Sequence, residues 1–334
     1  MPDTYLISGG AGFIGSHLAE ALLVRGDRVI ALDNLSTGRL QNLDPIGGTE
    51  NFRFVQGSVL DELIVDELTH ECDVVVHLAA AVGVQLIVDQ PLRSFTTNIR
   101  GSENVIEAAH RYRRKILVAS TSEIYGKNGD GPLSEDADRV IGSPAVARWA
   151  YSTAKAVDES LAYMYHRERG LPTVVVRLFN TVGPRQSPAY GMVIPRLVRQ
   201  AVADEPMTVF GDGHQTRCFC HVVDVVDGLL RLLDEPAAIG DVFNVGSQDE
   251  ISMLALSARI RELAESESQV ELIAYEAAYG PGFADMRRRV PDTAKLRELT
   301  GWRPSRALDD ILRETIAEAV AERDAAAALA AGER

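Results

Sequence analysis

The sequence predicts an α/β fold built on a doubly wound parallel sheet. Its first half alternates short, nearly continuous apolar runs with longer segments of helical periodicity. Apolar strands separated by helices are typical of a parallel sheet that is covered on both faces, and right-handed crossovers distribute the helices over the two sides. In such a sheet, we expect the ligand to lie beyond the carboxyl ends of the strands.

The expected strands are residues 5–8, 28–32, 52–56, 74–78, 116–120, 173–178 and 241–245. Helices are expected from about Phe13 and over 91–111, 149–169, 192–202, 222–233, 252–264 and 308–319. The pattern loosens after Leu178, which indicates a second, smaller part. We therefore expect a Rossmann domain of residues 1–178 and 221–248, an interleaved α/β substrate domain of 179–220 and 249–325, and a tail of 326–334.

Composition excludes several classes of protein. The 334 residues are 46% hydrophobic, enough for a sizeable core. No apolar run approaches the ~20 residues of a membrane span, and the first residues lack a basic signal-peptide region, so we expect a soluble cytoplasmic protein. The net charge of −14 argues against nucleic acid or a membrane as partner. Three oddly spaced cysteines predict neither a disulfide framework nor a metal site.

A glycine-rich turn follows the first expected strand. Gly9, Gly12 and Gly15 let the backbone turn tightly and approach a pyrophosphate, and the helix that follows directs free N–H groups at the same point. The second strand leads to Asp33, whose carboxylate would accept hydrogen bonds from an adenosine ribose and repel a 2′-phosphate. The pattern predicts a dinucleotide site that prefers NAD to NADP.

Tyr151 and Lys155 are four residues apart in an expected helix, so their side chains share one face. A phenol with a pKa of ~10 is too weak a base at neutral pH. A nearby ammonium and a positively charged nicotinamide would both favour the phenolate. Thr121, at the end of the fifth expected strand, offers a hydroxyl to the same site. These residues predict oxidation of an alcohol by NAD, with Tyr151 as the base.

These motifs together resemble those of the extended short-chain dehydrogenase/reductase superfamily, in its branch of NAD-dependent nucleotide-sugar epimerases and dehydratases. The resemblance covers residues 5–316 and implies that residues 77–80 lie along the cofactor. We expect His77 itself to be a packed structural histidine and not a catalyst. The loop after Asp33 would hold the adenosine end, although Ser58 stands where the family usually has an aspartate. The further cofactor contacts that the resemblance implies are Phe13, Ile14, Asn34, Ser36, Thr37, Gly38, Ser58, Val59, Leu78, Ala79 and Ala80.

The run Thr121-Ser122-Glu123 resembles that of UDP-glucuronate decarboxylases and GDP-mannose dehydratases, whereas epimerases commonly have Ser or Ala at the position of Glu123. Segments 179–185, 209–217, 279–285 and 289–292 also resemble decarboxylase segments. The resemblance implies Thr121 and Glu123 as catalytic residues beside Tyr151 and Lys155. It implies nucleotide-sugar contacts from Ser122, Asn180, Arg185, Arg217 and Arg289. The expected reaction is decarboxylation of UDP-glucuronate to a UDP-pentose or 4-keto pentose.

Three alternatives stay open at this point. Residues 190–193 look more like those of UDP-sugar 4-epimerases acting on UDP-glucose or UDP-glucuronate. A 4,6-dehydratase ranks third, because glucose dehydratases have an aspartate where this chain has Ser122. A non-catalytic NAD-binding regulator would need a broken Tyr151/Lys155 pair, and the pair is intact.

By resemblance, helices 91–111 and 149–169 would form a homodimer interface.

Overall fold

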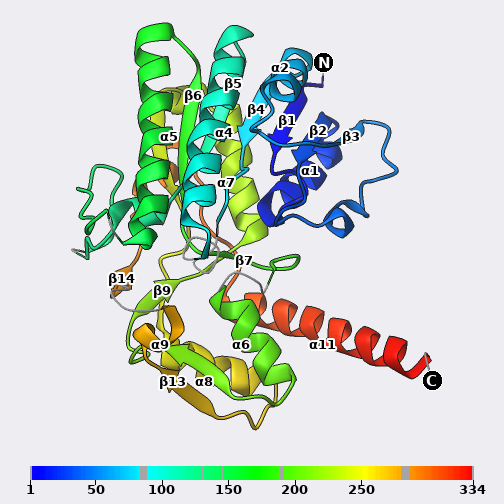
Figure 1. Ribbon diagram of the computed structural model, residues 1–334, viewed down its shortest axis with the longest axis vertical. Helices are drawn as coiled ribbons and strands as arrows, with labels where there is room; N and C mark the ends of the chain where they lie inside the picture. The colour runs from blue at the N-terminus through cyan, green and yellow to red at the C-terminus, as the bar shows by residue number, and fades with distance from the viewer. Residues whose placement is uncertain are drawn as a thin grey trace.

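The computed structural model describes residues 2–82, 89–129, 131–144, 146–187, 192–279 and 286–332. Its main sheet has seven parallel strands in the order β3-β2-β1-β4-β5-β6-β11 (Figure 1). The order reverses between β1 and β4, as expected of a doubly wound sheet, so the predicted fold class is confirmed. The strands are β1 (Thr4–Ser8), β2 (Arg28–Asp33), β3 (Phe52–Gln56), β4 (Val74–His77), β5 (Lys115–Thr121), β6 (Thr173–Leu178) and β11 (Asp241–Val245).

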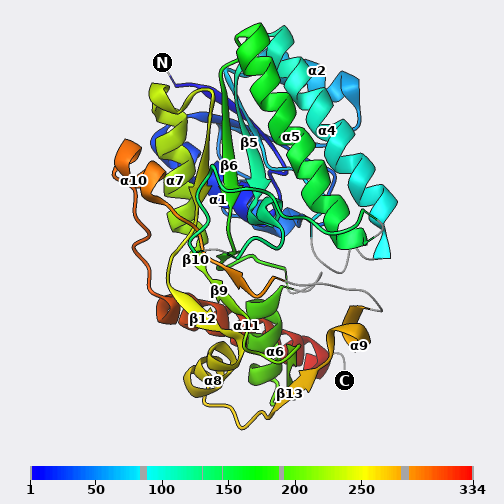
Figure 2. The same ribbon diagram turned by 90° about the vertical axis from the view of Figure 1, so that its left-hand side faces the viewer.

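Helices cover both faces of this sheet. One apolar core lies between the sheet and α1 (Phe13–Arg25) and α7 (Val222–Asp234). A second core lies under α2 (Glu62–Glu71), α4 (Pro91–Arg111) and α5 (Ala147–Arg169). The last two helices lie side by side in both ribbon views (Figure 2). The middle residues of the central strands are buried on both faces and are mostly apolar, as expected of a covered parallel sheet, whereas the edge strand β3 is partly exposed.

A smaller lobe lies beyond the carboxyl ends of the strands, and it has its own apolar core. This core is enclosed by helices α6 (Val193–Val202), α8 (Met253–Leu263) and α11 (Leu308–Gly332) and by a parallel pair of strands, β8 (Met207–Phe210) and β13 (Val270–Ile273). Short strands lie between the two lobes. They are β7 (Thr181–Val182), β9 (Thr216–Cys218), β10 (Cys220–His221), β12 (Glu250–Ser252) and β14 (Arg288–Arg289).

The remaining elements are short: α9 (Tyr275–Tyr279), α10 (Ala294–Thr300) and the 3₁₀ turns η1 (Leu40–Leu43), η2 (Ser122–Tyr125) and η4 (Pro236–Ala238). Although residues 249–325 were expected in the smaller part, α10 packs on α7 and β11, and Leu296 and Trp302 are buried in the first core of the main sheet. The domain boundaries otherwise stay a prediction. None of the helices in the described ranges has the length and apolarity to cross a membrane.

Candidate active site

The predicted glycine turn joins β1 to α1 and is tightly folded. Gly9 has a φ of +77° and donates its N–H to the carbonyl of Leu32 at 2.8 Å. A Cβ atom on Gly15 would lie 2.1 Å from the carbonyl oxygen of Gly9, so no other side chain fits there without moving the backbone. Helix α1 has no capping side chain and no acidic residue in its first turn. Its N–H groups and positive dipole end therefore suit a pyrophosphate, and these residues fit the phosphates of NAD.

Asp33 ends β2 directly beside this turn. One carboxylate oxygen accepts the N–H of Ala11 at 3.0 Å and the other accepts the N–H of Leu35 at 2.8 Å. Burial raises the pKa of Asp33, while the hydrogen bonds from Leu35, Ala11 and Gly12 lower it. Asp33 thus lies beside the turn, and each of its carboxylate oxygens already accepts a backbone N–H that holds the turn in shape.

The other predicted cofactor residues gather along the same edge of the sheet. Phe13, Ile14, Leu78 and Ala80 line the large cavity described below, and Ala79 packs against Gly9. In the loop after β2, the side-chain oxygen of Asn34 accepts the N–H of Ser36, and Gly38 packs against Ala11. Thr37 lies between them in the sequence. Ser58 and Val59 follow β3, where Ser58 accepts the N–H of Leu60 and Val59 lies against Gly101 of α4.

His77 is buried at the end of β4, between the hydroxyls of Ser8 (2.7 Å) and Ser102 (3.0 Å). Burial, followed by the charge of Lys155, lowers the pKa of His77 to about 3, so the imidazole is neutral at physiological pH. Both ring nitrogens are satisfied by the protein, in line with the structural role expected for this residue.

Tyr151 lies on α5 and faces the end of β5. It is 6% exposed and its phenol hydrogen-bonds with Thr121. Burial raises the pKa of Tyr151 above its ordinary value, the charges of Glu123 and Asp158 raise it further, and the Thr121 hydrogen bond and Arg289 oppose them. The protein alone thus keeps this residue as a phenol, and the expected lowering of its pKa requires an added positive charge such as that of the nicotinamide.

Lys155 is one helical turn further along α5, on the same face. Its ammonium donates to the carbonyl of Ala119 on β5 and to the carboxylate of Asp158, each at 3.0 Å. Its side chain is almost completely buried but reaches the wall of the cavity. Tyr151 and Lys155 therefore share the helix face that the sequence predicted. The pairing with Asp158 was not expected, although a residue three positions along a helix lies within reach.

Glu123 and Arg289 come from distant parts of the chain and meet beside Tyr151. Arg289 of β14 donates to the carboxylate of Glu123 and to the side-chain oxygen of Asn180, both at 2.6 Å. The Asn180 amide in turn donates to the carbonyl of Cys218 at 2.8 Å. Since both charges are largely buried, the guanidinium and carboxylate hold each other in fixed positions at the wall of the cavity.

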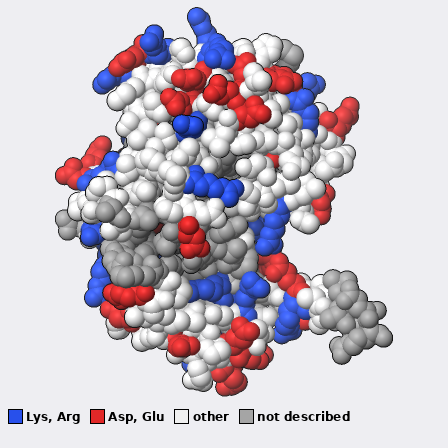
Figure 3. Space-filling view, viewed as in Figure 1, with Lys and Arg blue, Asp and Glu red and all other residues white. Residues whose placement is uncertain are grey.

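A cavity of about 390 Å³ lies between the sheet edge and the smaller lobe. Its lining includes Thr121, Ser122, Glu123, Tyr151, Lys155, Asn180, Arg217 and Arg289 from the predicted site, together with residues that the sequence did not single out, such as Gln186, Arg196, Phe210, Gln215 and Tyr275. Among the described residues, four basic side chains and one acidic side chain face it. Basic side chains also border the middle of the face in Figure 3. This excess of positive charge suits an anionic ligand despite the acidic composition of the chain.

Two predicted substrate residues have different surroundings. Arg217 is buried at the cavity wall, with one nitrogen donating to the carbonyl of Thr216 at 2.7 Å. Arg185 instead lies against α1, where it donates to Glu20 at 2.7 Å, and its side chain is not among those that line the cavity. Its backbone N–H donates to Glu318 of α11 at 2.9 Å, so Arg185 joins α1 to the smaller lobe. Residues 190–191 and 280–285, whose motifs concerned the choice between epimerase and decarboxylase, lie outside the described residues.

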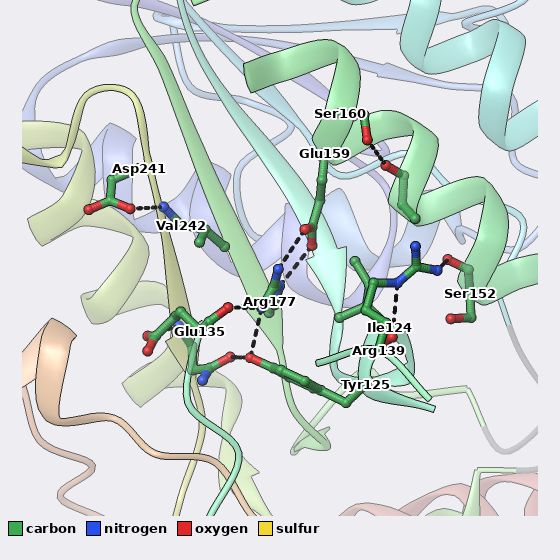
Figure 4. Close-up of polar contacts among 12 residues, drawn as sticks. Ile124, Tyr125, Glu135, Arg139, Ser152, Glu159, Ser160, Arg177, Asp241 and Val242 are labelled. Carbon is green, nitrogen blue, oxygen red and sulfur yellow. Dashed lines mark hydrogen bonds and ion pairs between the residues drawn. The ribbon is translucent and has the colours of Figure 1, made fainter. Parts of the chain in front are cut away.

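A polar network with a buried centre at Arg177 and Glu159 lies next to the site (Figure 4). Arg177 on β6 forms two hydrogen bonds with Glu159 of α5, at 2.8 and 3.0 Å, and a third with the hydroxyl of Tyr125 at 3.0 Å. Arg139 donates to the carbonyls of Ile124 and Ser152. These bonds tie η2, which carries Glu123, to the helix that carries Tyr151.

Comparison with known proteins agrees with this geometry. A family model described as GDP-mannose 4,6 dehydratase matches residues 6–315. The chain is 40% identical over 317 residues to UDP-N-acetyl-alpha-D-glucosaminuronate decarboxylase of Bacillus cytotoxicus, covering 95% of this chain and 97% of that protein. It is 35% identical over 311 residues to UDP-glucuronic acid decarboxylase 1 of Xenopus tropicalis, covering 93% and 70%.

Among solved structures, the UDP-glucuronic acid 4-epimerase of Bacillus cereus, in complex with UDP-glucuronic acid and NAD, aligns with a TM-score of 0.84 at 29% identity. The alignment covers 95% of this chain and 98% of the epimerase. The glycine turn, the Tyr151/Lys155 helix face and the basic cavity are thus found in a chain that is similar to such enzymes over nearly its whole length. The chain belongs to the GDP-mannose 4,6-dehydratase family of NAD-dependent nucleotide-sugar enzymes.

Proposed function

We propose that the protein decarboxylates a UDP-linked uronic acid, such as UDP-glucuronate, to a UDP-pentose or its 4-keto form. The observation that carries this proposal is the Glu123–Arg289 pair beside Tyr151. Oxidation of the sugar alcohol needs only the tyrosine and the cofactor. A uronic acid brings an additional carboxylate to the site, and a buried guanidinium is the group best suited to receive it.

The chemistry follows from the substrate. When bound, NAD⁺ supplies the hydride acceptor for C4. Tyr151 takes the proton of the C4 hydroxyl, and Thr121 orients that oxygen. The resulting C4 ketone is β to the C6 carboxylate, so the C5–C6 bond can break, CO₂ leaves, and its bonding electrons form an enolate. Arg289 would bind the C6 carboxylate, Glu123 would position the sugar ring, and a proton then adds to C5 of the enolate. The UDP-pentose forms when the hydride returns to C4, and the 4-keto pentose forms when it does not.

The remaining contacts follow from the same arrangement. The phosphates of NAD would lie at Gly9, Gly12 and Gly15. Lys155 would bind the nicotinamide ribose through its free N–H. Arg217 and Asn180 would bind the nucleotide diphosphate at the far wall of the cavity, with Ser122 beside the sugar. Arg185 would affect binding indirectly, by holding α1 in place through its ion pair with Glu20.

The test is a mass-spectrometric assay of the purified protein with UDP-glucuronate, supplied with NAD⁺. We expect loss of CO₂ from the sugar, and no reaction in a Tyr151→Phe variant that still binds NAD. The relative at 40% identity favours a second substrate, UDP-N-acetylglucosaminuronate, which is assayed in parallel. Conversion of UDP-glucose or UDP-glucuronate to an isomer of unchanged mass would select the 4-epimerase instead, and loss of water from a nucleotide-hexose would select the dehydratase.

We further propose that the protein works in the cytoplasm as a homodimer. Helices α4 and α5 pack side by side and leave Leu92 78% and Met164 52% exposed on their outer surfaces. Packing against the same two helices of a second copy would cover these side chains. Sedimentation at micromolar concentration should give a dimer for the wild type and a monomer for the Met164→Glu variant. A monomeric wild type would refute the assembly.

A further inference from the structure

Asp158 is a buried carboxylate that the proposed reaction does not use. It follows Lys155 by three residues on α5, has no solvent exposure, and accepts the lysine ammonium at 3.0 Å. The same ammonium donates to the carbonyl of Ala119. An ammonium has three hydrogens, so these two bonds fix its position and leave one N–H for the cavity that Lys155 lines.

The second oxygen of Asp158, Oδ1, is buried and has no hydrogen-bond partner in the described structure. Burying a carboxylate costs free energy, and a buried ion pair can often be replaced by apolar side chains without loss of stability. The burial of this ion pair is therefore weak evidence that it serves stability. The carboxylate provides a fixed negative charge next to Lys155. Lys155 is in turn one helical turn from Tyr151, the phenol that must act as a base.

Charged and titratable groups surround Tyr151 from several elements. Glu123 of η2 and Asp158 of α5 are negative, and Arg289 of β14 and Lys155 of α5 are positive. His77 of β4 is neutral. Glu123 is itself paired with Arg289, and Lys155 with Asp158. With both pairs intact, the protein offers the phenol little net positive charge, and burial then favours the protonated form.

We propose that Asp158 is a positioning residue for Lys155 that also offsets its charge, so that Tyr151 becomes a base only after a positively charged nicotinamide has entered the site. The device restricts proton removal to the complex that can also accept hydride. It rests on the proposed function only in taking Tyr151 as the base for C4 oxidation, a step that decarboxylase, epimerase and dehydratase share.

The test compares Asp158→Asn with the wild type. The amide keeps an acceptor for Lys155 and removes the charge. Glu168→Gln, an exposed carboxylate on the same helix, is the matched control. Ionisation of Tyr151 is followed as the ultraviolet phenolate band of NAD-free and NAD-bound protein, after subtraction of the same protein carrying Tyr151→Phe. The acidic limb of the pH profile of kcat reports the same ionisation during turnover.

In Asp158→Asn, we expect the phenolate to form at lower pH than in the wild type, by roughly half a unit or more, with and without NAD. The acidic limb of kcat should move in the same direction, and Glu168→Gln should leave both unchanged. Asp158→Glu keeps the negative charge, so the acidic limb of its kcat profile should lie closer to the wild-type position than that of Asp158→Asn. If Asp158→Asn does not fold, Asp158→Ser serves in its place.

A merely structural aspartate would give a different result. Its loss would lower kcat equally at all pH values and would leave the phenolate titration and the limb where they are in the wild type, which would overturn the inference. The titration needs no substrate. An absence of CO₂ release by the wild type would therefore refute the proposed function while the role of Asp158 is still decided by the phenolate band.

Discussion

Replacing Gly15 with alanine should disable the dinucleotide site without unfolding the protein. The added Cβ would lie 2.1 Å from the carbonyl oxygen of Gly9, 2.9 Å from its carbonyl carbon and 3.0 Å from the Cα of Gly10. Heavy atoms pack at roughly 3.5 Å, so the methyl group overlaps the oxygen by over ~1 Å. All three obstacles are backbone atoms of the turn, so the turn and the start of α1 must move apart.

The size of the effect follows from this geometry. Overpacking of a tight site costs about 1–3 kcal/mol. Part of that strain appears as lower stability, and the displaced N–H groups no longer converge on a pyrophosphate. Since about 1.4 kcal/mol corresponds to a factor of ten in affinity, we expect NAD binding to weaken roughly tenfold to a hundredfold.

The assay is calorimetric titration of NAD into wild type and Gly15→Ala, with urea unfolding of both. Gly48→Ala is the control, because a Cβ there meets no atom within 4 Å. It should leave NAD affinity unchanged and alter stability by less than about 1 kcal/mol. Gly15→Ala that binds NAD within twofold of the wild type would refute the assignment of this turn to the phosphates.

Three further predictions concern charged and titratable groups. Arg177→Met should destabilise the protein by about 3–5 kcal/mol in urea unfolding, because it leaves Glu159 buried without its partner; a loss below about 1 kcal/mol would contradict the network. The contribution of His77 to the free energy of unfolding should be fully present above about pH 6.5 and be lost as the pH falls towards 3, because the unfolded chain binds a proton that buried His77 does not. The urea midpoint of His77→Asn should therefore depend less on pH over that range than that of the wild type. Arg289→Lys should lower kcat with UDP-glucuronate at unchanged NAD affinity, since an ammonium cannot bridge Glu123 and Asn180 as the guanidinium does; full turnover would argue against its role.

Several features of the site were predictable because they depend on local patterns. The apolar runs and helical periods identify the sheet and its helices, and a spacing of four residues is enough to place Tyr151 and Lys155 on one face of α5. The glycine turn is local as well, since a strand, three glycines and a helix follow one another directly. The family resemblance added Glu123 and Arg289 to the predicted site but did not indicate that they pair with each other.

Contacts between distant segments were decided only by the tertiary structure. Glu123 and Arg289 are 166 positions apart, and their pairing depends on β14 lying beside β9 at the edge of the cavity. The same holds for Arg185, which a motif assigned to the substrate and the fold directs to α1. The sequence by itself determined which elements form and which chemical groups they carry. Which of those groups meet was settled by packing of the two lobes, because a side chain's partner across the fold leaves no trace in the spacing of its own segment.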